Sequence, residues 1–322
     1  MLTYATFITG LQDPISNWIK QEKHRVKMIL DGACLFEAST NRNKIINEPY
    51  FFNMFSVLSQ GAGTIEHLMK KVLLKPPQMR KSRGTFRIVT SKENQLIAVD
   101  KKLRNDVEML ITAKTGMIPE RRGGGKEFWF LSRSEGITLF MERHPPVHIP
   151  NEMNKSKWGP VIFDEKKLKK GELRPQLAYC LNRLAEPSPD DVMIDPFCGY
   201  GAVTRSRAIY FPCREIHALD IKPAVKNIKK ADIRDLPSIF PPQSVDVIVT
   251  DPPWGLYDNE ADISALYASL SAACKYVLKP GGRAVILTAQ KEILQNWQPE
   301  ARYDILVSGQ KAAIFVIRAE AN

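Results

Sequence analysis

The pattern of hydrophobic and polar positions changes character near the middle of the chain. In the first half, runs that alternate with period two are mixed with stretches whose apolar residues recur at helical spacing. This mixture predicts an α+β domain over residues 1–145. Strands are expected at 4–10, 26–38 (a hairpin turning at Asp31-Gly32) and 85–91, helices at 62–72 and 102–116, and a hairpin from 127–134 and 136–143.

The second half follows a regular strand–loop–helix rhythm. Residues 146–172 contain several prolines and a lysine run, which predicts a linker. From 173 to 322, alternating βα units predict a mostly parallel sheet with helices on both faces, and the last two strands, which are joined by a short turn, predict an antiparallel edge hairpin. Strands are expected at 192–195, 215–220, 245–251, 283–289, 301–309 and 312–318, and helices at 173–185, 202–210 and near 260–278.

Length and composition are those of an ordinary globular protein. A chain of 322 residues suits two domains, and 44% hydrophobic with 25% charged residues is typical of soluble folds. No apolar run is long enough to span a membrane, and the N-terminus lacks the pattern of a signal peptide. The five scattered cysteines indicate a reducing, cytoplasmic setting and predict neither a disulfide framework nor a metal site.

The positive charge is concentrated in the first half of the chain. Residues 1–150 hold 23 Lys and Arg against 14 Asp and Glu, whereas residues 151–322 hold 23 against 21. Such an asymmetry favours a polyanionic partner for the N-terminal domain. Three basic segments are candidates for phosphate contacts: 80–87, Arg121-Arg122 and the lysines of 166–170.

The first motif with chemical meaning is DPFCGYG at 195–201, which lies between a predicted strand and a predicted helix. Glycines at Gly199 and Gly201 permit a tight turn and a close approach of the backbone to a ligand. The acid that precedes them, Asp195, would repel a pyrophosphate but suits an amino-bearing, cationic ligand. The methionine end of S-adenosylmethionine presents such a group.

Two further acids follow in the same βα frame. Asp220 ends the next strand, where an acid accepts hydrogen bonds from ribose hydroxyls. Asp232 is expected to accept the adenine amino group, with Ile221 and Ile233 flanking the ring, although Asp235 competes for this role and helix capping would also explain either acid.

The second motif is DPPWG at 251–255, after the apolar strand VDVIVT. Two prolines remove two N–H donors and fix φ, so the carboxylate of Asp251 and the carbonyl of Pro252 can converge as acceptors on one exocyclic amine. Pro253 completes the rigid pair, and Trp254 offers a flat face for the target base. The motif predicts methylation of a base nitrogen, with catalysis by positioning and electrostatics.

Together, DPFCGYG, ADIRDLP, TDPPWG and VLKPGGRAVIL resemble the class I S-adenosylmethionine-dependent methyltransferases with a D-P-P-W/Y motif. With LRPQLAYCLNRLA before the loop, the chain is similar to the THUMP-domain RNA guanine-N2 methyltransferases, whose loop reads DPFCGSGT where this chain has Tyr200 and Ala202. The resemblance implies a seven-stranded Rossmann-like sheet with its last strand antiparallel, a ferredoxin-like and THUMP-like N-terminal domain, and tRNA as partner. It also implies that Pro175 lies near the cofactor. The expected cofactor contacts are Pro175, Asp195, Phe197, Gly199, Gly201, Asp220, Ile221, Asp232 and Ile233, and the expected catalytic residues are Asp251, Pro252, Pro253 and Trp254.

Three functions remain open at this point. The first is methylation of guanine N2 in RNA, with tRNA as the favoured substrate; the second is an adenine-N6 or cytosine-N4 methyltransferase acting on DNA or rRNA; the third is a non-catalytic RNA-binding protein. About 50 residues separate the two motifs and about 70 follow the second, which leaves little room for a DNA-recognition region and favours RNA. Nothing in the sequence indicates an accessory protein subunit.

Overall fold

The computed structural model describes residues 1–39, 45, 47–120, 123–145, 149–255 and 263–320. These residues form two compact units. The first comprises 1–6, 16–46 and 52–146, and the second comprises 7–15, 47–51 and 147–322. Segments 7–15 and 47–51 therefore belong with the C-terminal unit although they lie far from it in sequence.

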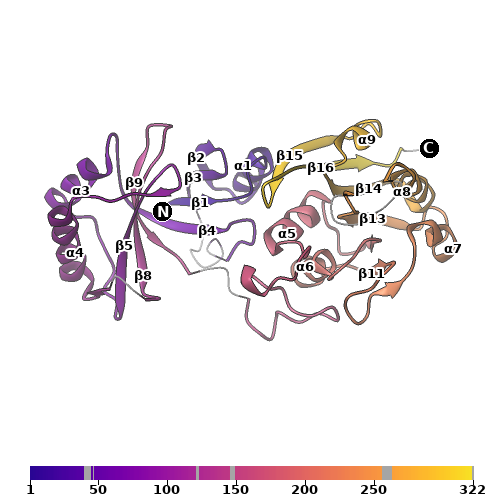
Figure 1. Ribbon diagram of the computed structural model, residues 1–322, viewed down its shortest axis with the longest axis horizontal. Helices are drawn as coiled ribbons and strands as arrows, with labels where there is room; N and C mark the ends of the chain where they lie inside the picture. Colours follow the sequence, from indigo (N-terminus) through magenta and orange to yellow (C-terminus); the bar gives the residue numbers. More distant parts are fainter. Residues whose placement is uncertain (40–44, 46, 121–122, 146–148, 256–262, 321–322) are drawn as a thin grey trace. The chain divides into compact units, whose positions relative to one another are not determined.

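The N-terminal unit is built on a nine-stranded sheet (Figure 1). Its main path runs β2-β3-β1-β4-β9-β8-β5-β6, and β7 pairs with β5. The strands are β1 (Leu2–Thr6), β2 (Arg25–Leu30), β3 (Ala33–Glu37), β4 (Asn53–Gly61), β5 (Thr85–Lys92), β6 (Gln95–Leu96), β7 (Ile118–Pro119), β8 (Lys126–Ser132) and β9 (Thr138–Arg143).

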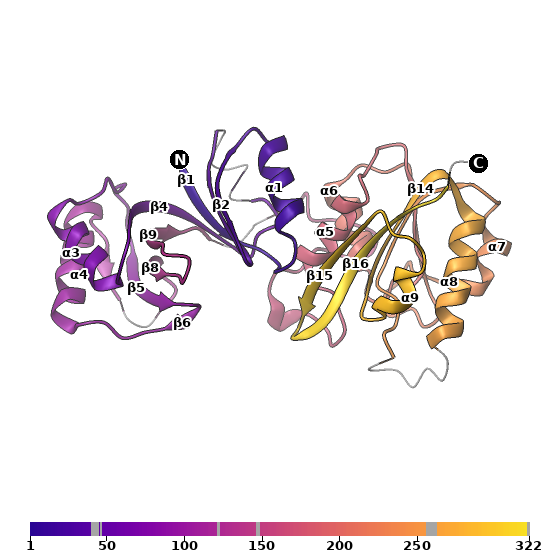
Figure 2. The same ribbon diagram turned by 90° about the horizontal axis from the view of Figure 1, so that it is seen from above.

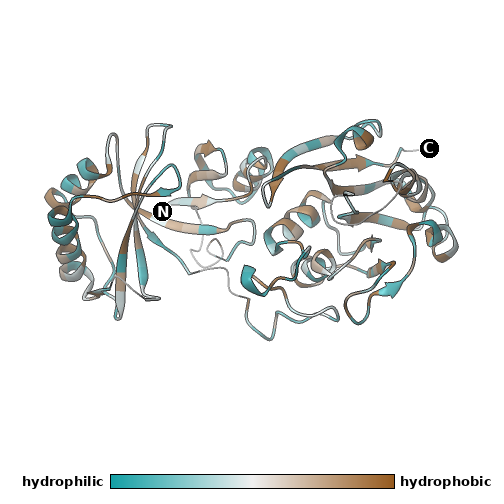
Figure 3. Cartoon of the chain, viewed as in Figure 1, coloured by the Kyte–Doolittle hydropathy of each residue, from teal (hydrophilic) through white to brown (hydrophobic). Residues whose placement is uncertain are grey.

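Helices α3 (Ile65–Leu74) and α4 (Lys101–Thr115) pack together beside this sheet, and α1 is Gln12–Gln21. Both α3 and α4 mix hydrophobic with hydrophilic residues along their length (Figure 3), as helices with one buried face do. Asp100 caps the start of α4 by accepting from the Leu103 N–H, and Gly116 ends it with φ +83°. The sequence signals for this helix therefore work through caps as well as through periodicity.

The C-terminal unit contains a seven-stranded sheet in the order β12-β11-β10-β13-β14-β16-β15. Strands β12, β11, β10, β13 and β14 are mutually parallel, and β16 runs antiparallel to both of its neighbours. Figure 2 shows β15 and β16 side by side. The strands are β10 (Val192–Asp195), β11 (Glu215–Asp220), β12 (Lys229–Lys230), β13 (Val245–Thr250), β14 (Leu278–Thr288), β15 (Ala301–Val307) and β16 (Gln310–Arg318).

Helices complete this unit and bury its sheet. They are η1 (Glu165–Lys167), α5 (Pro175–Leu184), α6 (Ala202–Tyr210), η2 (Ile233–Asp235), α7 (Leu236–Ile239), α8 (Ile263–Val277) and α9 (Lys291–Gln295). One face of α8 enters a core with β10, β13 and β14, and Tyr267 and Leu270 on that face are fully buried. No helix in the described ranges is long and apolar enough to cross a membrane.

The expected fold class, a Rossmann-like seven-stranded sheet plus an N-terminal α+β region, is confirmed, whereas some element boundaries were wrong. The strand expected at 4–10 ends at Thr6, because Phe7 and the residues after it enter the other unit. Trp158, in the predicted linker, is only 3% exposed and packs in the C-terminal unit, so residues 149–172 are anchored although they have little regular structure. Arg121 and Arg122 lie outside the described residues.

Candidate active site

The two predicted motifs meet at the carboxyl edge of the parallel sheet. Strands β10 and β13 are direct neighbours, with Ile194 opposite Ile248. Asp195 at the end of β10 therefore lies beside Thr250 and Asp251 at the end of β13. Ligands of open parallel sheets bind at such strand ends.

Asp195 is almost completely buried, with 1% of its surface exposed. Its Oδ1 accepts the Thr250 hydroxyl at 2.8 Å and the Phe197 N–H at 3.3 Å. Burial nevertheless raises the pKa of Asp195 to about 7, because loss of water outweighs these two bonds, and Asp220 adds repulsion. The carboxyl of Asp195 therefore titrates near neutral pH, and a positive charge bound beside it would favour its ionised form.

The glycine loop is fastened to the end of β11. Asp220 Oδ2 accepts the Gly199 N–H at 2.8 Å, and its Oδ1 accepts the Lys222 N–H at 2.7 Å. The Leu219 carbonyl accepts the Cys198 N–H at 2.9 Å. Each carboxylate oxygen has two acceptor positions, so Asp220 can hold the loop and still accept ligand hydroxyls.

The loop requires its glycines for different reasons. Gly201 begins α6 with φ +80°, and a Cβ added there would lie 3.4 Å from the Trp158 Cβ. Gly199 has φ +51°, and a Cβ added there would meet nothing within 4 Å. The backbone at Gly199 therefore borders open space, as expected of a loop that a ligand approaches.

The remaining predicted cofactor contacts have mixed surroundings. Asp232 caps η2, forms a capping box with Asp235 and pairs with Arg234 at 2.5 Å, which lowers the pKa of Asp232. The Asp232 carboxylate is therefore engaged in helix capping, and contact between Asp232 and the adenine remains a prediction. Ile221 is 50% exposed after β11, whereas Ile233 is 3% exposed within the core. Pro175 is the first residue of α5 and is buried, and Phe197 packs against the core from the glycine loop.

Asp251 accepts the Trp254 indole N–H at 3.2 Å through Oδ1. Although the side chain keeps intermediate exposure, burial raises the pKa of its carboxyl to about 7, and the neighbouring Asp195 raises it further. Within the described residues, no Lys or Arg forms an ion pair with either Asp195 or Asp251. A cation bound beside the two carboxylates would be strongly favoured.

A polar brace holds the D-P-P-W segment, and no sequence pattern pointed to it. The Tyr267 hydroxyl on α8 donates to the Pro253 carbonyl at 3.3 Å and lies 2.5 Å from the Thr288 hydroxyl. Thr288 accepts the Gln290 N–H at 2.9 Å, and the Gln290 side chain donates to the Trp254 carbonyl at 2.8 Å. The three bonds are consistent with one order of donors: the Gln290 N–H donates to the Thr288 hydroxyl, the Thr288 hydroxyl to the Tyr267 hydroxyl, and the Tyr267 hydroxyl to the Pro253 carbonyl. These bonds fix the carbonyls of Pro253 and Trp254.

Replacing Tyr267 by phenylalanine is expected to lower kcat for methyl transfer about 10-fold with little change in cofactor affinity. The reason is that one hydrogen bond of about 1–1.5 kcal/mol is lost from the segment that positions the acceptor. Kinetics with saturating cofactor, together with a direct binding titration, would measure both. Tyr210→Phe is the control. The Tyr210 hydroxyl is buried and forms no hydrogen bond with another described residue, and the Tyr210 ring packs against Tyr179 on α5. Equal effects of the two variants would contradict a role for the brace.

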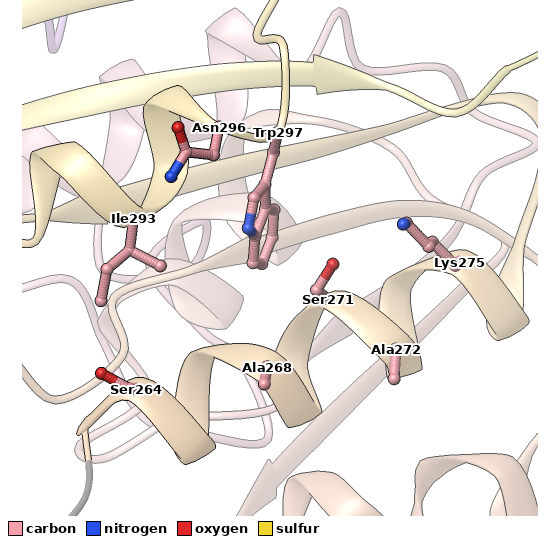
Figure 4. A pocket seen from close by; sticks show the side chains of 8 residues that line it. All are labelled: Ser264, Ala268, Ser271, Ala272, Lys275, Ile293, Asn296 and Trp297. Carbon is pink, nitrogen blue, oxygen red and sulfur yellow. The ribbon is translucent and has the colours of Figure 1, made fainter.

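A separate hollow of about 470 Å³ lies along α8 and α9 (Figure 4). Its lining shares no residue with the two motifs. Small side chains of α8 form one wall and Trp297 rises on the other side. The lining residues are Ser264, Ala268, Ser271, Ala272, Lys275, Ile293, Asn296 and Trp297.

Comparison with known proteins agrees with this geometry. Residues 165–214 and 221–305, which include both motifs, match the family described as "RMKL-like, methyltransferase domain". The matched segments comprise 135 of the 322 residues and are similar to that family. The match starts before α5 and extends into β15, so it covers most of the C-terminal unit.

Curated relatives and a solved structure extend the likeness. A Thermus thermophilus tRNA (guanine(6)-N2)-methyltransferase is 30% identical over 147 residues, which cover 40% of this chain and 43% of that protein. The mouse tRNA (guanine(6)-N(2))-methyltransferase THUMP3 is 29% identical over 185 residues, 47% of this chain and 37% of that protein. The chain thus matches less than half the length of these relatives. The crystal structure of TrmN from Thermus thermophilus covers 99% of both chains with a TM-score of 0.74 at 17% identity, which shows a shared fold.

Proposed function

We propose that the protein transfers a methyl group from S-adenosylmethionine to the N2 amine of guanine in tRNA. The observation that carries this proposal is the placement of Asp251 and the braced D-P-P-W segment beside the buried Asp195. Two relatives that match the catalytic domain are named tRNA guanine-N2 methyltransferases, which supports the choice of base and RNA.

The residues fit a cationic cofactor. Asp195, which is buried, and Asp251, which is partly exposed, form no ion pair in the described ranges, and Gly199 leaves room for a ligand. In the proposed arrangement Asp195 attracts the amino group of the methionine moiety, and Asp220 accepts the ribose hydroxyls. Asp232, with Ile221 and Ile233, borders the adenine, while Pro175, Phe197 and Gly201 shape the pocket wall. When bound, the cofactor supplies an electrophilic methyl group on sulfur.

Residues of the D-P-P-W segment then orient the amine for methyl transfer. A guanine N2 is a poor nucleophile because its lone pair is delocalised into the base. The Asp251 carboxylate and the Pro252 carbonyl accept its two N–H groups, which orients the lone pair toward the methyl group. Trp254 stacks on the base. Because extrusion of a stacked base costs a few kcal/mol, an unpaired or weakly paired nucleotide is the favoured substrate.

The proposal includes tRNA binding by the basic, THUMP-like N-terminal unit and activity in the cytoplasm, where cysteines such as Cys34 and Cys180 remain reduced. All five cysteines are free in the structure, and four are buried.

Nucleoside analysis tests the chemistry directly. The protein is incubated with methyl-labelled S-adenosylmethionine and total tRNA, and the digested nucleosides are separated and weighed. N2-methylguanosine is the expected product. N6-methyladenosine or N4-methylcytidine would refute the guanine assignment and favour the second interpretation of the D-P-P-W motif.

A further inference from the structure

The catalytic unit carries its own lysine-rich surface next to the cofactor loop. Segments 154–158 and 221–230 read NKSKW and IKPAVKNIKK, and they contain six lysines and no acid. Every one of these lysines is exposed: Lys155, Lys157, Lys222, Lys226, Lys229 and Lys230. We define this set as the lysine surface.

The two segments are 60 or more residues apart in sequence, yet buried contacts join them. Trp158 is 3% exposed and packs with Cys198, Ala218 and Ile228. Its indole N–H donates to the Asn227 carbonyl at 3.0 Å, and the Asn227 amide donates to the Lys157 carbonyl at 2.8 Å. The backbones that carry Lys157 and Lys226 are therefore held side by side.

The lysines of this surface lack ion pairs with acids, in contrast to several arginines of the same unit. The arginines of the same unit find acids: Arg205 pairs with Glu172, Arg234 with Asp232, and Arg302 with Asp304. In the portions of the chain that the structure describes, no lysine of the lysine surface forms an ion pair with a carboxylate. The Lys157 ammonium lies over the Trp158 ring at 4.5 Å instead. Clustered like charges without counter-charges attract polyanions.

The lysine surface is close to the proposed chemistry. Lys222 follows Asp220 by two residues, and β12 pairs with the end of β11, with Asp220 opposite Lys230. Strand β11 lies two strands from β13, so its end is about 10 Å from the start of the D-P-P-W segment. A nucleotide that reaches Trp254 would bring its neighbouring phosphates over this region.

We propose that the lysine surface binds the phosphate backbone of the substrate RNA next to the methylated nucleotide. This inference rests on the proposed function for the identity of the polyanion. It gives the catalytic unit a direct part in RNA binding, in addition to any contribution of the N-terminal unit.

The test compares two double variants of the full chain. Lys157→Gln with Lys226→Gln removes one charge from each segment, and Lys275→Gln with Lys311→Gln removes two exposed charges of the same unit elsewhere, on α8 and β16. Binding of tRNA is measured as a function of salt. Each lost phosphate contact reduces the slope of log K against log salt by about 0.7–0.9, so the first variant should lose about 1.4–1.8 in slope. The control should keep the slope of the original protein.

Cofactor affinity and methylation provide the second readout. We expect the first variant to bind tRNA about 10-fold more weakly at low salt, with a matching rise in KM for tRNA and unchanged affinity for S-adenosylmethionine. Charge reversal to Glu at both positions should enlarge the loss. Slopes and KM values equal to those of the control would overturn the inference. Failure of the proposed function would give a different result: the original protein would yield no N2-methylguanosine in tRNA. The binding measurements would still test the lysine surface in that case.

Discussion

Replacement of Asp251 by asparagine should lower kcat about 10²–10³-fold and leave the affinity for S-adenosylmethionine within about threefold. The amide side chain would keep an oxygen for the Trp254 indole, so the local structure survives, but the negative acceptor for the amine is lost. Loss of one preorganised electrostatic contact at a reacting centre typically costs a factor of this size. Single-turnover methyl transfer to tRNA and a binding titration of the cofactor are the measurements.

The same variant has an outcome that would contradict the assigned role. If Asp251→Asn lost cofactor binding and turnover to the same degree, the carboxylate would hold the cofactor instead of the base amine. Asp246→Asn is a suitable control, since Asp246 lies on β13, the strand that precedes Asp251, pairs with Lys279 at 2.6 Å and touches neither motif. Its turnover should remain close to that of the original protein.

Replacement of Asp195 by asparagine should weaken binding of S-adenosylmethionine about 10- to 100-fold, because a charged hydrogen bond of about 1.5–3 kcal/mol is lost. The original protein should also show a pH dependence. Burial raises the pKa of Asp195 to about 7, so the group is neutral below that pH and charged above it. Affinity for the cationic cofactor should therefore rise with pH, about 10-fold per unit below pH 7, and level off above it.

The pH profile distinguishes this mechanism from simple loss of structure. Asp195→Asn should bind weakly and with a flatter profile, whereas a variant that only disturbs the fold would keep the slope. Burial also raises the pKa of Asp251 to about 7, but Asp251 is assigned to the base amine, so the slope of cofactor affinity should persist in Asp251→Asn. Calorimetric titration between about pH 6 and about pH 8.5 measures both affinity and slope. A flat profile in the original protein would refute the role of Asp195 as the charged partner.

The local patterns of the sequence were sufficient for most elements of both units. The hairpin at Asp31-Gly32, the helix that ends at Gly116 and the final antiparallel pair were predicted correctly, because turn residues, helix caps and periodicity act between near neighbours. Strand β4 and helix α1 were not predicted. Strand β4 is central in its sheet and lacks a clear alternation, and the boundary between the two units falls within α1, after Ile15.

The location of the candidate active site could be predicted from the order of residues along the chain. Acids that directly follow successive parallel strands must gather at one edge of the sheet, so the linear pattern alone brought Asp195, Asp220 and Asp251 together. Contacts between distant segments carry no such local signal, and they became visible only in three dimensions. The brace of Tyr267, Thr288 and Gln290, and the bonds of Trp158 with Asn227, arise from α8, β14 and loops that meet through packing of the core. Such partners have neither fixed spacing nor periodicity, because burial and spatial proximity select them.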